Sequence, residues 1–275
     1  MNRLAAGQIL TTRLLGVSAL IVAVAGCASA PSWPSYPAVP GVSEIDLKWE
    51  PRRDMRLVHR ITTDIEASGA GTRPMPDTEK KRRVAQTRAL DITDVAPDHF
   101  DLRVVRDGWP VPATLRLSRA WQPIDVTADA GVGAQDERAV KAAMRQLAEP
   151  LAQSAQVFGR WTIGETKPFS IRMSGIPDAS GSGQGDMTFR GVVMVDGRRA
   201  AEFDWKGTVE FLLAGDPGRG VPGRMRVTGK EWRDLATGAS LRVTARADAE
   251  FTRQGEVTHV RYRTDEALDQ AASRL

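Results

Sequence analysis

Residues with reactive or metal-binding side chains are few in this sequence. It has one cysteine, Cys27, and three histidines, His59, His99 and His259. A single thiol excludes an internal disulfide and a zinc site built from several thiolates. The sequence also lacks a G-x-S-x-G nucleophile elbow, an H-E-x-x-H metal motif and a Walker loop. We therefore predict no catalytic residue, no metal, no cofactor, and a protein that is not an enzyme.

Three polar residues fall on the apolar side of segments that alternate like strands. His59 alternates with a leucine and an isoleucine, while Gln86 and Arg88 alternate with a valine, a leucine and an isoleucine. A polar group on a dry face must find a partner, because leaving it unpaired costs roughly 1–3 kcal/mol. Two interpretations stand. These groups are paired inside the core, or they line a ligand cavity and orient a bound headgroup. His59, Gln86 and Arg88 are the candidate ligand-binding residues.

The elements that position these residues follow an N-terminal targeting segment. Arg3 and Arg13 accompany an apolar stretch of 12 residues over 14–25. A transmembrane helix needs about 20 apolar residues. The stretch therefore fits the apolar region of a signal peptide better than a membrane span. We predict a signal peptide over residues 1–26.

Residues 24–27, Val-Ala-Gly-Cys, resemble the bacterial lipobox. The resemblance implies cleavage before Cys27, a diacylglyceryl group on its sulfur, and acylation of the new amine by a chain such as palmitate. Several acyl chains on one residue anchor a protein firmly, so the membrane is an expected partner. The lipoproteins it resembles are held at the inner membrane when aspartate follows the cysteine. Ala28 stands there instead, which implies the periplasmic side of the outer membrane. The alternative is an ordinary signal peptide with an incidental cysteine.

Residues 27–42 form a proline-rich tether in this interpretation. Prolines recur every third residue, at 31, 34, 37 and 40, which is the period of polyproline II. Trp33, Tyr36 and Val39 share this period and form a second edge. At roughly 3.1 Å per residue the tether could reach about 40–45 Å. It is either a passive stalk or a segment whose Trp33/Tyr36 edge meets lipid headgroups or a partner protein.

Period-two alternation predicts a single β-rich domain over residues 43–275. In 241–251 the odd positions are apolar, and the even positions are charged or threonine. One dry and one wet face are typical of antiparallel sheets. We expect a mainly β fold, a strongly curved antiparallel sheet, half-barrel or barrel of about eleven strands. The predicted strands are 44–50, 55–66, 81–93, 98–106, 111–118, 168–175, 185–195, 198–213, 222–234, 239–253 and 256–264.

One helix is expected over residues 136–158, between the fifth and sixth predicted strands. Apolar residues recur there at steps of three and four, and Pro150 should kink the helix. The Gly-x-Gly-x-Gly segment at 181–185 is not followed by a helix, so it does not suit a phosphate cradle. We expect a flexible connection over 176–185 instead.

Two further segments carry a resemblance to a known group. Trp161–Thr166 reads Trp-Thr-Ile-Gly-Glu-Thr, and Trp232–Gly238 contains an aspartate followed by threonine-glycine. With the lipobox and the tether, they resemble a group of uncharacterised bacterial envelope lipoproteins whose mature domain is mostly β. The resemblance implies an architecture similar to half-barrel carriers of lipoproteins and lipids. It implies no catalytic residues.

Charge and targeting leave three functions open. The chain has 275 residues, and 38 Lys and Arg against 34 Asp and Glu give a net charge of +4. So small an excess argues against nucleic acid as a partner. The first interpretation is a non-enzymatic lipoprotein that binds or carries an apolar or amphipathic envelope molecule. The alternatives are a scaffold for envelope proteins and an envelope hydrolase with an unrecognised site.

Overall fold

The computed structural model describes residues 33–69, 81–107, 112–129, 140–141, 144, 148, 151–173, 179–213, 220–253 and 255–275. Strands dominate this part of the chain, which confirms the predicted mainly β class. Their bounds are β1 (Glu44–Leu47), β2 (Arg56–Gly69), β3 (Lys81–Val95), β4 (His99–Arg106), β5 (Ala113–Ser118), β6 (Pro123–Ala128), β7 (Gly159–Thr162), β8 (Thr166–Met173), β9 (Ala179–Val195), β10 (Arg198–Leu213), β11 (Val221–Asp234), β12 (Ser240–Arg253) and β13 (Glu256–Leu268).

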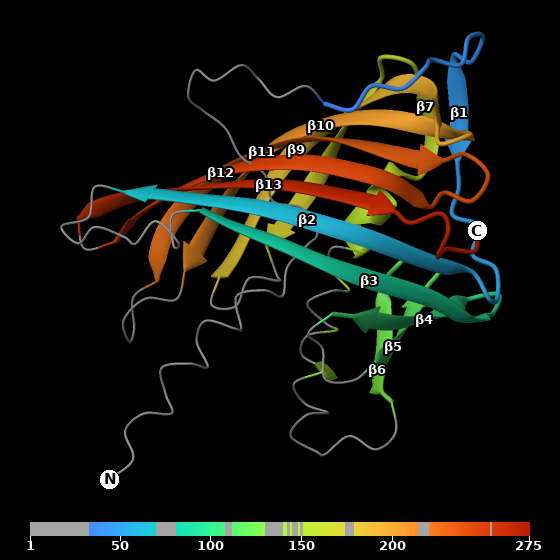
Figure 1. Ribbon diagram of the computed structural model, residues 1–275, viewed down its shortest axis with the longest axis horizontal. Coiled ribbons are helices and arrows are strands. Elements are labelled where there is room, and N and C mark those ends of the chain that lie inside the picture. Colours follow the sequence, from blue (N-terminus) through green and yellow to red (C-terminus); the bar gives the residue numbers. More distant parts are fainter. Residues whose placement is uncertain are drawn as a thin grey trace.

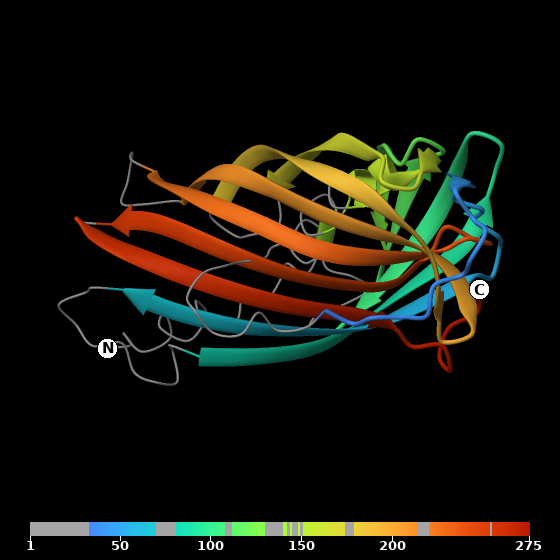
Figure 2. The same cartoon turned by 90° about the horizontal axis from the view of Figure 1, so that it is seen from above.

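Eleven of the described strands form one antiparallel sheet, in the order β6-β5-β4-β3-β2-β13-β12-β11-β10-β9-β8. Two meanders, β2–β6 and β8–β13, are joined by the pairing of β2 with β13. Figures 1 and 2 show that this sheet is strongly curved. Among the described strands, β6 and β8 are its two edges. Of the predicted alternatives, the open curved sheet is therefore the one observed.

Two short strands were not predicted. β6 begins with a proline and buries one residue, Val126, so its alternation is weak. β7 has 4 residues and pairs with β1 in a separate two-stranded sheet. A strand of this length carries little periodic signal. Because β6 lies between β5 and the helical segment, that segment follows the sixth strand, whereas the prediction placed it directly after the fifth.

The expected flexible connection over 176–185 was wrong from residue 179 onward, because β9 begins there. Gly181, Gly183 and Gly185 pair across the sheet with residues of β8 and β10. A Cβ on Gly183 would lie 1.9 Å from the Thr208 carbonyl oxygen, and one on Gly185 would lie 2.6 Å from the Phe169 ring. Glycine recurs every second residue here because neighbouring strands and side chains fill the space that its own side chain would need.

The sheet has an inner and an outer face, which β10 defines most clearly. Phe203, Trp205, Val209 and Phe211 are buried on the inner face. Lys206, between them on the outer face, is exposed. This confirms the predicted alternation. Inner-face residues form two hydrophobic clusters, one around Phe100, Leu102 and Leu115, the other around Phe189, Phe203 and Trp161.

The predicted helix over 136–158 is present in the described residues of that range. Residues 140–141, 144, 148 and 151–154 are helical, and the 3-10 turn η2 (Ala155–Val157) follows. Met144 and Ala148 are buried in the first hydrophobic cluster. Phe158 is already extended, so the helical segment ends before it. Pro150 lies outside the described residues, and its predicted kink stays a prediction.

The described part of the predicted tether, residues 33–42, lies against the sheet. The Val39 N–H donates to the Val192 carbonyl at 2.8 Å, and the Met194 N–H donates to the Pro37 carbonyl at 2.9 Å. The Tyr36 ring meets the buried Trp232 indole edge-on, with centroids 5.3 Å apart. The Tyr36 hydroxyl also accepts a hydrogen bond from Arg242 at 3.1 Å. Tyr36 thus packs against the first hydrophobic cluster of its own chain. The signal peptide and Cys27 lie outside the described residues.

Candidate functional site

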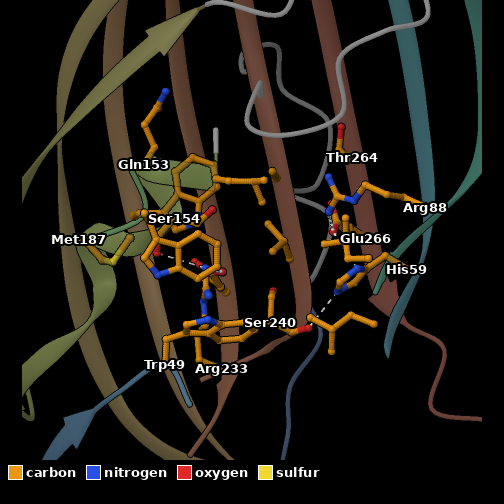
Figure 3. Close-up of a pocket in the computed structure, with 18 of the residues that line it drawn as sticks. Trp49, His59, Arg88, Gln153, Ser154, Met187, Arg233, Ser240, Thr264 and Glu266 are labelled. Carbon is orange, nitrogen blue, oxygen red and sulfur yellow. Dashed lines mark hydrogen bonds and ion pairs between the residues drawn. The ribbon is translucent and has the colours of Figure 1, made fainter. Parts of the chain in front are cut away.

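A cavity of about 100 Å³ opens between the inner face of the sheet and the end of the helical segment (Figure 3). Its wall draws on both meanders: His59 and Arg88 come from β2 and β3, and Phe169 and Trp205 come from β8 and β10. Most of the wall is apolar or aromatic. Two groups of charged side chains interrupt it, on opposite sides in Figure 3.

His59 lies in the cavity wall and is 3% exposed. Its Nε2 is 3.2 Å from the Ser240 carbonyl oxygen, so Nε2 carries the proton and donates it. Its Nδ1 is 3.8 Å from the Glu266 carboxylate. Burial lowers the pKa of His59 below its ordinary 6.5 and outweighs the opposing effect of Glu266. His59 is therefore a neutral hydrogen-bond donor at neutral pH.

Arg88 also lies in the wall, and its guanidinium donates to the Glu266 carboxylate. Both side chains are less than a tenth exposed. Removing either partner would leave a buried charge, which is costly. The structure thus supplies Arg88 with a carboxylate partner inside the protein.

Gln86, the third predicted residue, is outside the cavity wall. Its side-chain oxygen accepts hydrogen bonds from the Nε and Nη2 of Arg106, at 3.2 and 2.8 Å. Arg106 pairs across the sheet with Arg88. Burial first, and the charge of Arg88 second, lower the pKa of Arg106 to about 10. Gln86 thus supports the arginine beside Arg88. The roles of His59, Gln86 and Arg88 toward a ligand stay predictions.

The opposite side of the cavity is organised by Arg233 of β11. Its guanidinium pairs with Glu231 at 2.7 Å and donates to the Gly238 carbonyl at 3.1 Å. It also donates to the Ser154 carbonyl at 3.4 Å and lies 5.4 Å from the centre of the Phe158 ring. Because Ser154 is the last described helical residue before η2, Arg233 ties the end of the helical segment to the sheet.

Two tryptophans form the aromatic end of the cavity. The rings of Trp49 and Trp121 lie 5.1 Å apart, and both line the wall. Both indole N–H groups are buried without a hydrogen-bond partner in the described structure. Trp121 also has a φ of 62°, an uncommon conformation for a large side chain. Unpaired donors beside an apolar cavity could bond to a polar group of a bound molecule.

Sequence reasoning missed Glu231, Arg233 and Glu266. The signal that could have identified them is the one used for His59, a polar or charged residue in the apolar phase of a strand. Each occupies an inner-face position of its strand, since Glu231 pairs with Val243 and Phe203, and Glu266 pairs with Val243 and Ile61. A charged residue in the apolar phase of a strand marks a buried charge that needs a partner.

In the described residues, no group of three or more His, Cys, Asp or Glu side chains is placed to hold a metal ion. The same residues contain no helix with the length and hydropathy needed to span a membrane.

Comparison with known proteins identifies no relative by sequence. No family model matches the chain, and no curated protein matches it. Among solved structures, the chain is similar to Ail, the attachment invasion locus protein of Yersinia pestis, at 6% identity and a TM-score of 0.19. The match covers 79% of this chain and 99% of that one. A second structure of Ail, in complex with the heparin analogue sucrose octasulfate, gives 6% identity, the same coverage and a TM-score of 0.18. Scores this low carry no inference about this chain.

Proposed function

We propose that this chain is a lipid-anchored protein of the bacterial envelope that binds and carries an apolar or amphipathic molecule. It acts without catalysis, is anchored through Cys27 to the outer membrane, and holds its ligand between the curved sheet and the helical segment. The observation that carries the proposal is the cavity whose wall draws on both meanders of the sheet. A scaffold with no ligand needs no such space in its core.

The distribution of polarity over the sheet supports this proposal. Inner-face residues such as Phe203 and Trp205 are buried, whereas the outer face of the same strands carries ion pairs such as Arg224–Glu210 and Lys230–Asp204. A sheet that faces lipid turns its apolar residues outward. Here the apolar residues face inward, which suits a protein with a charged, hydrated surface and an apolar interior for a ligand.

The cavity is too small to hold a lipid unless part of its wall moves. Pockets for small molecules usually measure about 300–1,000 Å³, and this cavity measures about 100 Å³. Leu151, Gln153 and Ser154 of the helical segment form one side of it. A displacement of residues 151–157 would enlarge the cavity while leaving the strands in place. We therefore assign this segment as the lid of the carrier.

Arg88 and its partner Glu266 are the groups proposed to meet a polar headgroup. An anionic headgroup would accept a charge-assisted hydrogen bond from the Arg88 guanidinium while Glu266 keeps its own bond to that group. Arg106, the next guanidinium across the sheet, adds positive potential at this end. The acyl chains would then lie toward Phe169, Met187 and Trp205.

The experiment is ligand detection followed by a binding assay. Native mass spectrometry of the protein purified from its own membrane should show added mass from a carried lipid. The mature, unlipidated domain should bind fluorescent fatty-acid and phospholipid analogues. Arg88→Ala should weaken the binding of anionic analogues more than that of neutral ones. Arg83→Ala is the matched control, because Arg83 lies on the same strand with its side chain 73% exposed. If no lipid co-purifies and neither analogue binds, the carrier proposal gives way to the scaffold.

A further inference from the structure

Two arginines face each other on the outer face of the sheet. Arg246 of β12 pairs directly with Arg263 of β13. Like charges directly opposite each other on neighbouring strands repel, which destabilises the pair. Arg263 has no carboxylate within ion-pair distance in the described structure. Asp64, its neighbour on β2, is instead paired with Arg83 at 3.6 Å.

The surroundings of this pair are shaped to receive a ligand. Trp33 stacks on the Arg246 guanidinium, with 4.1 Å between the guanidinium carbon and the ring centre. Trp33, Pro34, Thr244 and Arg263 line a hollow of about 200 Å³. Thr244 is 6% exposed, and its hydroxyl has no hydrogen-bond partner in the described structure. The one carboxylate in the hollow, Asp265, is held by Arg242 through both of its oxygens.

We propose that Arg246, Arg263, Thr244 and Trp33 bind the phosphate of a phospholipid headgroup and seat the outer face of the sheet on the membrane. Guanidinium groups match phosphate oxygens in geometry and charge, and the threonine hydroxyl supplies a further donor. Tryptophan is the side chain most typical of the headgroup region. This inference rests on the proposed anchoring of the chain at Cys27.

The length of the chain between Trp33 and Cys27 favours a lipid over a free anion. Trp33 lies six positions after Cys27, and six fully extended steps of the chain span at most about 21 Å. Trp33 is fixed on the outer face by its stacking on Arg246. A chain anchored at Cys27 would therefore hold this arginine pair close to the headgroups. A site so placed meets membrane phosphates at a high local concentration.

The test uses the chain from residue 28 onward, which contains every residue that the structure describes and lacks the anchor. Cosedimentation is measured with vesicles of phosphatidylcholine alone and of phosphatidylcholine mixed with phosphatidylglycerol. Arg246→Gln and Arg263→Gln should each lower the affinity for the mixed vesicles about fivefold, the contribution of one basic residue near an anionic surface. Arg224→Gln is the control, because Arg224 lies on the same face outside the hollow and pairs with Glu210 at 3.2 Å; it should change that affinity less than about twofold.

Several results would overturn the inference. An equal loss in all three variants would mean diffuse attraction with no site. Binding of inorganic phosphate by calorimetry, without binding to vesicles, would make the ligand a free anion. The absence of both would remove the anion site altogether. Arg263→Gln should leave the binding of the fluorescent fatty-acid analogue unchanged, so failure here is distinguishable from failure of the carrier proposal. Melting temperatures near that of the unsubstituted chain establish that the variants are folded.

Discussion

Arg88 and Glu266 form an ion pair that is nearly closed to water. The pair is stable only while both charges are present. Removing one partner of a buried pair typically costs about 3–5 kcal/mol, because the other charge stays behind without compensation. Arg88→Ala should lower the free energy of unfolding by that amount. Arg83→Ala, whose side chain is 73% exposed, should cost less than about 1 kcal/mol. Urea denaturation measures both, and equal losses would contradict the burial of the Arg88–Glu266 pair.

The stability of the protein should decrease as the pH falls, because His59 is buried in its neutral form. Burial lowers its pKa in the folded state below the ordinary 6.5, so the unfolded chain binds the proton more readily. The stability due to the neutral imidazole is complete above about pH 6.5 and is lost as the pH falls toward the lowered pKa. His59→Gln can still donate to the Ser240 carbonyl without titrating. Between pH 7.5 and pH 5, the melting temperature of the unsubstituted protein should fall further than that of His59→Gln. A parallel fall in both would contradict this role of His59.

At the scale of elements, the alternation in β10 makes a sharp prediction. Trp205 is 4% exposed on the inner face, and Lys206 points to the outer face. Truncating a buried aromatic residue to alanine typically costs about 3–5 kcal/mol, whereas an exposed change stays within about 0.5 kcal/mol. Denaturation midpoints of Trp205→Ala and Lys206→Ala should therefore differ widely. Similar midpoints would mean that β10 has another register.

The edge strand β8 is covered by two glutamine side chains. Gln156 accepts from the Ser170 N–H at 2.9 Å and donates to the Ser170 carbonyl at 3.1 Å. Gln153 makes the same pair of bonds with Arg172, at 3.2 and 3.1 Å. Each amide therefore imitates one residue of a neighbouring strand, which blunts an edge that could otherwise pair with another chain.

These bonds connect the proposed lid to the sheet, and hydrogen exchange can follow each of them. In Gln156→Ala the Ser170 amide should exchange faster, while the Arg172 amide keeps its protection. In Gln153→Ala the pattern should reverse, because each glutamine protects one amide. Unchanged exchange in both variants would show that the glutamines do not hold the lid to β8.

Features of the fold and site that depend on a single segment could be predicted from the sequence, whereas features that depend on contacts between distant segments could not. The alternation of β10 and β12 lies within single segments, so their faces were correctly predicted. The strand character of Gly181–Gly185 depends on Phe169 and Thr208 in neighbouring strands, and a single segment does not contain that information. His59 and Arg88, which line the cavity, could be singled out because a polar residue in the apolar phase of a strand is a local signal. Their link to Glu266 spans 178 residues from Arg88 and depends on the fold.

At the scale of the whole molecule, the anchor is the feature most open to a direct test. Cys27→Ser should abolish lipidation and leave an unprocessed precursor, because serine offers no thiolate for acyl transfer. Membrane fractionation and the apparent mass of the protein measure both effects. Ala28→Ser is a matched control, since it leaves the thiol in place and should still be processed. A Cys27→Ser protein that reaches the membrane at the processed size would contradict lipid attachment at Cys27.

The pairing of β2 with β13 also imposes an order on folding. Thr63 and Thr264, whose hydroxyls lie 3.3 Å apart across this pair, are separated by 201 positions in the chain. Contacts so distant in sequence close large loops and form slowly. During synthesis the meander β2–β6 emerges long before its neighbour β13, with the edge of β2 still unpaired. Exposed edges of this kind invite aggregation. The edge of β2 stays exposed to other copies of the chain until β13 has emerged, so β13 is the strand that joins the two meanders into one sheet.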